Sequence, residues 1–222
     1  MFDTALKIEK AEGCGAIVRD IDLAHITDTE AAALRQALFD HGVLFFRGQS
    51  ITPEQHIALA ERFAPIDVNR FFPADAAYDT LAPELQQKLR GMKAVHSSAH
   101  IFGEDGAYAQ TDQKVMSGSR DLPETVHPVI IRHPGSGKPV LYVNPAFTIR
   151  FEGQTRDESL PLLMDLYAHA IAKDRVHTFV WEEGSVAMWD NRASWHFAKN
   201  DYHGHYRLMH RITLQGEALE AA

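Results

Sequence analysis

The sequence predicts a mainly β fold with flanking helices, arranged as a jelly roll. Helical patterns occur mostly in the first half of the chain, and short apolar runs separated by Gly and Pro dominate the second half. The chain has 222 residues, of which 45% are apolar, so it can bury one such core without a second one. We therefore predict a single domain over residues 1–222.

The first half is predicted to contain a short strand, a buried strand and three helices. Thr27-Asp28-Thr29-Glu30 has the spacing of a capping box, and Gly42 is placed to end the helix that follows. Pro53 fits the first turn of a second helix, after Thr52. The remaining elements are a strand and turn at 16–23, a buried strand at 43–46 and a helix at 83–90.

The second half is predicted to contain several strands interrupted by one helix. The helix carries apolar residues on one side and covers residues 156–172. The strands are expected at 126–132, 140–143, 176–181, 185–189 and 206–214.

The overall charge and composition exclude several classes of partner. A net charge of −8 without a basic tract argues against nucleic acid and against anionic membranes. No apolar run approaches the ~18 residues of a membrane span, and the N-terminus does not resemble a signal peptide. The single cysteine, Cys14, suits a reducing compartment, so we expect a cytoplasmic protein, which could also form a homo-oligomer.

Two arginines near the C-terminus indicate a binding site for anions. If residues 206–214 are extended, Arg207 and Arg211 lie on the same face of the strand, and the opposite face is largely apolar. Buried guanidinium groups need anionic partners, and arginine pairs well with planar carboxylates. The alternative is an exposed edge strand with solvated arginines, and the spacing alone leaves both interpretations open.

The string that contains these arginines resembles a known family. It begins at Trp189-Asp190-Asn191-Arg192 and continues through His196, Asp201-Tyr202, Arg207 and Arg211. It is similar to the C-terminal signature of the taurine/2,4-dichlorophenoxyacetate dioxygenase family. Nearly the whole chain resembles this family in order, including the segments 15–23, 41–49, 54–63, 126–128 and 142–153.

The resemblance implies a double-stranded β-helix fold and oxygenase chemistry that uses Fe(II), 2-oxoglutarate and O₂. It implies that His196 is the distal iron ligand, that Arg207 binds 2-oxoglutarate and that Arg211 binds an acidic substrate. Phe147 matches an aromatic residue near the substrate. The implied reaction hydroxylates a small or medium organic acid, such as a sulfonate, a sulfate ester or an aryloxy or alkyl carboxylate, and releases succinate and CO₂.

The sequence departs from the family where the other two iron ligands belong. The family carries them as His-x-Asp or His-x-Glu, and none of the 13 histidines has an acidic residue two positions later. A Gly-Gly-Asp-Thr stretch whose threonine contacts 2-oxoglutarate is also absent. Both would belong to one block that is missing between about residues 67 and 76.

Two explanations compete for the missing block. Either the protein contains a segment that this sequence omits, or the gene carries a deletion that leaves a protein without a complete iron site. We favour the first, because removing two strands from a closed barrel would leave backbone polar groups unpaired.

Two other classes of function are alternatives to the oxygenase. A zinc hydrolase could use His196, His203, His205 and His210, but these residues lack a recognisable ligand spacing. A jelly-roll binding module without iron could hold a small acid through Arg207 and Arg211. His96 and His100 are expected to have surface or packing roles.

Overall fold

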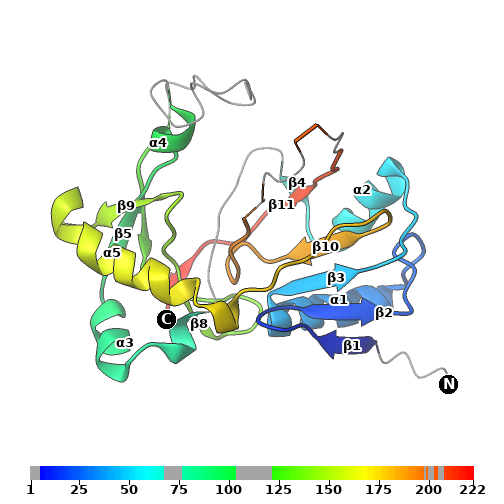
Figure 1. Cartoon of the computed structure of the whole chain (residues 1–222), viewed down its shortest axis with the longest axis horizontal. Helices are drawn as coiled ribbons and strands as arrows, with labels where there is room; N and C mark the ends of the chain where they lie inside the picture. Colours follow the sequence, from blue (N-terminus) through cyan, green and yellow to red (C-terminus); the bar gives the residue numbers. More distant parts are fainter. Residues whose placement is uncertain (1–5, 68–76, 104–121, 198, 200–202, 205–207) are drawn as a thin grey trace. The chain divides into compact units, whose positions relative to one another are not determined.

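The computed structural model describes residues 6–67, 77–103, 122–197, 199, 203–204 and 208–222 (Figure 1). The chain divides into two compact units. The first unit contains residues 1–73, 134–136 and 173–218, and the second contains residues 74–133, 137–172 and 219–222. The assignment of the whole chain to a single domain stays a prediction.

A four-stranded sheet is the centre of the first unit (Figure 1). Strands β2 and β3 are parallel, and the other two pairs are antiparallel. The strand order is β1 (Lys7–Lys10), β2 (Ala16–Arg19), β3 (Val43–Phe46) and β10 (Val186–Trp189).

Strand β3 is buried on both faces, which explains its uninterrupted apolar sequence. Leu44 and Phe46 belong to a core cluster that includes Leu34 of helix α1 (Asp28–His41) and Leu59 of helix α2 (Pro53–Glu61). Val43 and Phe45 belong to a second cluster, against which Phe179, Ala187 and Trp189 pack. The prediction of a buried strand at 43–46 is confirmed.

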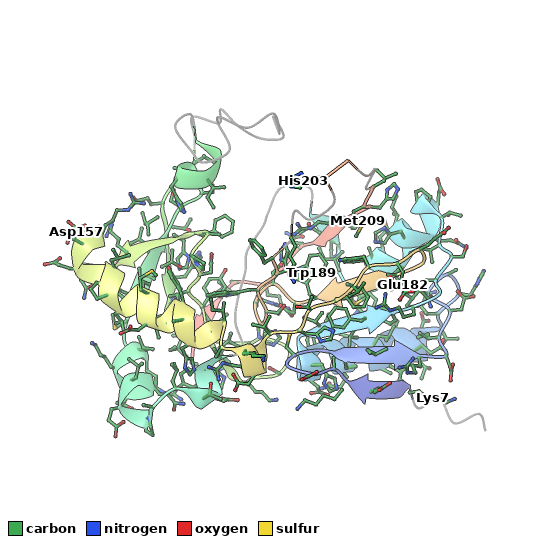
Figure 2. The ribbon with its side chains drawn as sticks, in the orientation of Figure 1. Lys7, Asp157, Glu182, Trp189, His203 and Met209 are labelled. Atoms are coloured by element: carbon green, nitrogen blue, oxygen red, sulfur yellow. The ribbon has the colours of Figure 1, made fainter. Side chains whose placement is uncertain are left out.

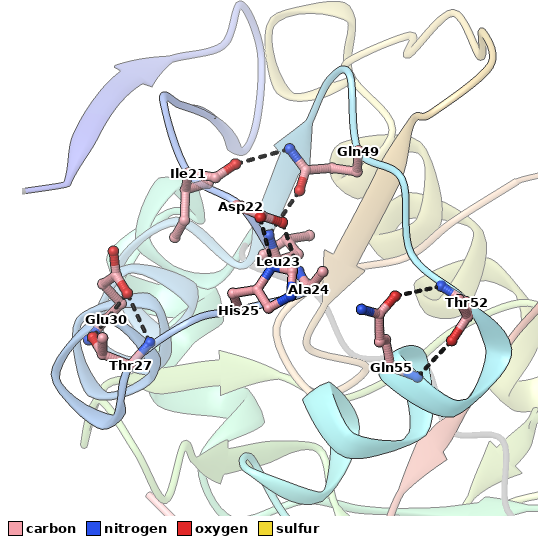
Figure 3. A network of polar contacts seen from close by, with 10 residues as sticks. All are labelled: Ile21, Asp22, Leu23, Ala24, His25, Thr27, Glu30, Gln49, Thr52 and Gln55. Carbon is pink, nitrogen blue, oxygen red and sulfur yellow. Dashed lines mark hydrogen bonds and ion pairs between the residues drawn. The ribbon is translucent and has the colours of Figure 1, made fainter.

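The two helices of this unit begin at the predicted capping boxes (Figure 3). The Thr27 hydroxyl accepts from the Glu30 N–H at 3.2 Å, and the Glu30 carboxylate accepts from the Thr27 N–H at 2.7 Å. Thr52 and Gln55 make the equivalent pair in α2. Gly42 ends α1 with a φ of 71°, in the region that favours glycine.

The side chain of Gln49 ties the chain after β3 to the turn after β2 (Figure 3). Its amide nitrogen donates to the Ile21 carbonyl at 3.0 Å, and its oxygen accepts from the Leu23 N–H at 2.9 Å. These two bonds satisfy the Ile21 carbonyl and the Leu23 N–H, which lie outside the strands, and they link the two segments.

Two predicted strands of the first unit are wrong in whole or in part. Residues 176–181 form no strand, and the Phe179 ring instead stacks on Phe45 with centroids 4.4 Å apart. This segment passes so close to Gly13 that a Cβ there would lie 2.5 Å from the Val176 carbonyl oxygen. Residues 208–212 also form no strand, and only β11 (Thr213–Leu214) pairs, with β4 (Ile66–Asp67).

The second unit contains two three-stranded sheets. One has the order β6 (Thr125–Pro128), β5 (Lys93–His96) and β9 (Thr148–Phe151). The other has the order β12 (Glu220–Ala221), β7 (Ile130–Arg132) and β8 (Pro139–Leu141). The predicted strand at 126–132 is therefore two strands, because the chain changes partner at Val129 from β5 to β8.

Two of the helices described in the second unit are close to their predicted bounds, and a third, short one was not predicted. They are α3 (Pro83–Leu89), the short α4 (Ala99–Phe102) and α5 (Arg156–Ala170), with a 3₁₀ turn at Ala77–Thr80. A further 3₁₀ turn, Lys173–Arg175, belongs to the first unit. Helix α5 begins at a third capping box, formed by Thr155 and Glu158. Within the part of the chain that the structure describes, no helix is long and apolar enough to cross a membrane.

Candidate functional site

The turn that follows β10 is held by a buried aspartate. The Asp190 side chain accepts from the Arg192 N–H at 2.8 Å, from Nε at 2.9 Å and from a terminal nitrogen at 2.7 Å. The Asp190 carbonyl accepts from the Ser194 hydroxyl at 2.9 Å and from the Ala193 N–H at 3.1 Å. A carboxylate neutralised in this way has a structural role, because its charge and its acceptor positions are already used.

Two of the predicted site residues, His196 and Arg211, contact the ring of Trp189. Trp189 lies at the end of β10 (Figure 2), and its indole N–H donates to the Asn191 side-chain oxygen at 2.8 Å. The His196 ring centroid lies 4.9 Å from that of Trp189. The Arg211 guanidinium carbon lies over the same indole, 5.3 Å from its centroid. The structure thus brings His196 and Arg211 together.

The surroundings of His196 favour its neutral form. Loss of hydration lowers the pKa of the His196 imidazole, and the positive charge of Arg211 lowers it further. Burial also lowers the pKa of the Arg211 guanidinium, which nevertheless remains charged at any ordinary pH. A neutral imidazole beside a fixed cation is suited to an anionic ligand.

The other two predicted site residues are placed differently. Arg207 lies outside the described residues. Phe147 belongs to the second unit, where its side chain is partly buried. Its N–H donates to the Asn144 side chain at 2.9 Å, and its carbonyl accepts from the Ser97 N–H at 2.8 Å. The backbone of Phe147 is therefore held firmly within its own unit.

The residues present do not fit the iron site that a two-histidine, one-carboxylate oxygenase requires. Over residues 6–67, 77–103 and the later described segments, no group of three His, Cys, Asp or Glu residues could hold a metal ion. The charged neighbour of His196 is the cation Arg211, and Asp190 is engaged by Arg192. Among described residues, this also leaves the zinc alternative without a site, and His205 lies outside them.

A buried cluster in the second unit was not predicted. His96 is 4% exposed, and its ring lies 5.4 Å from that of His127 and 5.5 Å from that of Tyr142. Nδ1 of His96 lies 3.3 Å from the Thr148 hydroxyl, and Nε2 has no hydrogen-bond partner among the described residues. Burial, with a smaller contribution from His127, lowers the pKa of His96 to about 3. One signal was available, because Ala94 and Val95 form the apolar centre of the short segment Lys93–His96.

Two surface hollows are lined by other residues. One, of about 310 Å³, is lined by residues of α1 and by Arg62. The other, of about 390 Å³, belongs to the second unit and includes His100, Arg150 and Arg156. Neither is lined by His196, Arg211 or Phe147, so the candidate site is defined by its side chains and not by a described cavity.

Comparison with solved structures identifies the class of fold. A crystal structure of a taurine dioxygenase from Burkholderia xenovorans is 26% identical, with a TM-score of 0.68. The match covers 85% of this chain and 80% of that one. The fold is that of a taurine dioxygenase-like protein.

The sequence comparison then gives the family. The model of the family described as "Taurine catabolism dioxygenase TauD, TfdA family" matches in two pieces, residues 7–76 and 69–213. The chain belongs to this family. The predicted resemblance is confirmed, and the two matched pieces overlap at residues 69–76.

Curated relatives differ in how much of their length they share with the chain. An alkylsulfatase from Acinetobacter baylyi is 33% identical over 67% of the chain. The chain spans about half the length of such relatives, 47% of this one and 48% of a second. An alpha-ketoglutarate-dependent 2,4-dichlorophenoxyacetate dioxygenase from Cupriavidus pinatubonensis is 24% identical, over 91% of the chain and 94% of the relative. That alignment extends over 279 residues, more than the 222 residues of the chain.

Proposed function

We propose that this chain carries the acid-binding part of an Fe(II)- and 2-oxoglutarate-dependent dioxygenase. The substrate is a small or medium organic acid: a sulfonate, a sulfate ester, or an aryloxy or alkyl carboxylate. The products are the hydroxylated acid, succinate and CO₂. The observation that carries the proposal is the Arg211 guanidinium beside His196 on the Trp189 ring. The names of the alkylsulfatase and of the 2,4-dichlorophenoxyacetate dioxygenase support the substrate class.

Four residues have distinct roles in this proposal. Arg211 binds the acidic group of the substrate, because a guanidinium fork matches carboxylate, sulfonate and sulfate oxygens. Arg207 binds the distal carboxylate of 2-oxoglutarate, His196 is the one iron ligand present, and Phe147 contacts the apolar part of the substrate. Oxygenase activity also requires the second histidine and the carboxylate that the 222 residues do not provide.

We propose that these two ligands belong to one block of the family fold that is absent between about residues 67 and 76. The two pieces of the family match support this, since they meet at residues 69–76. The alignment with the Cupriavidus relative supports it too, because its length requires residues that the chain does not have. With the block present, the fold would be a single double-stranded β-helix.

The absent ligands also favour a second candidate function. If the gene encodes only these 222 residues, the protein is an iron-free binding module that holds a small acid through Arg207 and Arg211. Sequencing the coding region and weighing the intact protein separate the two cases. We propose the cytoplasm as its location, because the single cysteine suits a reducing compartment.

Two arginine variants test the division of roles. Arg211→Ala should weaken binding of an alkyl sulfate, such as hexyl sulfate, by ~1.5–3 kcal/mol, the contribution of a charge-assisted pair. Its affinity for 2-oxoglutarate should change little, and Arg207→Ala should show the opposite pattern. Calorimetric titration of both variants with both ligands measures this. Equal losses for both ligands in both variants would mean that the roles are assigned wrongly.

Turnover tests the enzyme directly. A protein that includes the block should consume 2-oxoglutarate and release succinate when Fe(II) and an organic acid are supplied, and His196→Ala should abolish that coupling. The 222-residue chain should show no turnover under the same conditions. A neutral compound preferred over every acid would contradict the substrate class.

A further inference from the structure

We propose that Trp189 is a positioning residue for acid binding: its indole ring is a shared platform that holds both the Arg211 guanidinium and the His196 imidazole in place. This inference rests on the proposed role of Arg211. It does not depend on whether the protein contains the missing block, because all the contacts involved lie within the first unit.

Three features of the chain restrain the indole ring of Trp189. The Trp189 backbone belongs to β10, where it pairs with Val43 of β3, and its side chain packs against the cluster of Ala11, Val43 and Phe45. The indole N–H donates to Asn191 at 2.8 Å, which sets the orientation of the ring about its own axis. A ring held by a strand, by packing and by a hydrogen bond has little freedom to rotate.

The indole ring restrains the Arg211 side chain. Residues 208–212 are in no strand, and the Arg211 side chain has several rotatable bonds. A guanidinium over an indole face is attracted by the negative face of the ring, and tryptophan is the best aromatic residue for this contact. The contact restricts the Arg211 guanidinium before an anion binds, so the side chain loses less conformational freedom on binding.

The same ring orients His196. Its centroid lies 4.9 Å from the indole, with the two planes tilted by 47°. The turn between them is held by bonds from Arg192 and Ser194 to Asp190, and His196 lies two residues after Ser194. The Trp189 ring therefore sets the spacing between the Arg211 guanidinium, which binds the acid, and the His196 imidazole.

The test uses the 222-residue chain, with hexyl sulfate and 4-chlorophenoxyacetate as probes. Trp189→Leu removes the ring and should weaken binding of the probes about fivefold to tenfold, the range of a partly desolvated cation–π contact. Trp189→Phe keeps a ring and should restore most of the affinity. Trp181→Leu is the matched control, since Trp181 is 41% exposed and its ring contacts Phe179. This control should bind as the unchanged chain does.

Fluorescence supplies a readout that a general loss of stability would not reproduce. The chain has three tryptophans, and the proposal assigns the change in emission on probe binding to Trp189. Trp189→Phe should lose this change while retaining binding, and Trp181→Phe should keep it. If Trp189→Leu does not fold, this pair of variants still decides the question.

The outcomes separate this inference from the proposed function. If Arg211→Ala abolishes probe binding and Trp189→Leu binds normally, the platform is wrong and the acid-binding role stands. The same conclusion follows if the emission change persists in Trp189→Phe. If Arg211→Ala binds normally, or if neither probe binds the unchanged chain, the acid-binding proposal fails and the platform fails with it.

Discussion

Residues 186–194 and residues 208–214 overlap the two ends of the C-terminal signature, which extends from Trp189 to Arg211, but only the first segment is held along its whole length. Strand β10 pairs with all four residues of β3, and Asp190 fixes the turn that follows. In the second segment, only Thr213 and Leu214 belong to a strand. The two segments have comparable apolar content, so composition does not explain the difference.

The side chains show the same contrast. Met188 is partly buried and packs against the core cluster of the first unit, whereas Met209 is 41% exposed and Leu208 is 62% exposed. An alternating pattern produces a strand only where a neighbouring strand offers hydrogen bonds and apolar surface. Among the described residues, no strand pairs with residues 208–212, and we propose that their neighbours belong to the missing block.

The largest expected effect concerns the turn of the well-held segment. Asp190→Ala removes the carboxylate and leaves the partly buried Arg192 without its main partner. We expect a loss of ~2–4 kcal/mol in the free energy of unfolding, measured by urea denaturation. Glu9→Ala breaks an exposed ion pair with Arg19 and serves as the control, with an expected loss below ~1 kcal/mol. Equal effects of the two substitutions would show that the Asp190–Arg192 pair stabilises the protein no more than an exposed ion pair does.

A matched pair of methionines tests the comparison itself. Met188→Ala should cost ~1–3 kcal/mol in stability, because it removes a side chain packed on the core. Met209→Ala should cost less than ~0.5 kcal/mol in the 222-residue chain, because the side chain is exposed. In a protein that includes the missing block, the cost at Met209 should increase. If it does not, the block is not the missing neighbour of this segment.

Elements set by local chemistry could be predicted from the sequence. Helices α1 and α2 begin at predicted capping boxes, and Gly42 ends α1 as its position indicated. Strand β3 was predicted because both of its faces are buried. The strand predicted at 176–181 and the 208–212 part of the strand predicted at 206–214 do not form, because strand formation depends on distant partners, which a local pattern does not contain.

The candidate site follows the same division. The signature led to His196 and Arg211, and the structure brings them together. It did not reveal Trp189 as their common contact, because a tryptophan in an apolar strand is usually a core residue. The cluster around His96 was not predicted, since His127 and Tyr142 come from segments far from His96 in the sequence.

The smallest expected effect is a pH dependence in the second unit. The folded state holds the pKa of His96 at about 3, below its ordinary value of 6.5. As the pH falls below about 6.5, the unfolded chain takes up a proton that the folded chain does not, so stability falls until about pH 3. The slope for one proton is at most about 1.4 kcal/mol per pH unit.

His96→Gln measures this contribution. Its stability should fall less steeply between pH 6.5 and 3 than that of the unchanged chain, when both are followed by urea denaturation at each pH. His203→Gln changes an exposed histidine and is the control for the substitution itself. Identical slopes for His96→Gln and the unchanged chain would mean that His96 is not held neutral.

Iron retention tests the central claim most directly. Two proteins are compared. One is the 222-residue chain, and the other is the same chain in which the corresponding block of the Cupriavidus relative replaces the residues between Asp67 and Ala77. Each is loaded with Fe(II) without oxygen, desalted and analysed for metal. The account predicts an equimolar amount of iron only in the protein with the block, and loss of that iron on His196→Ala. Equimolar iron in the 222-residue chain would contradict it, because these residues would then hold the metal without the ligands that the family uses.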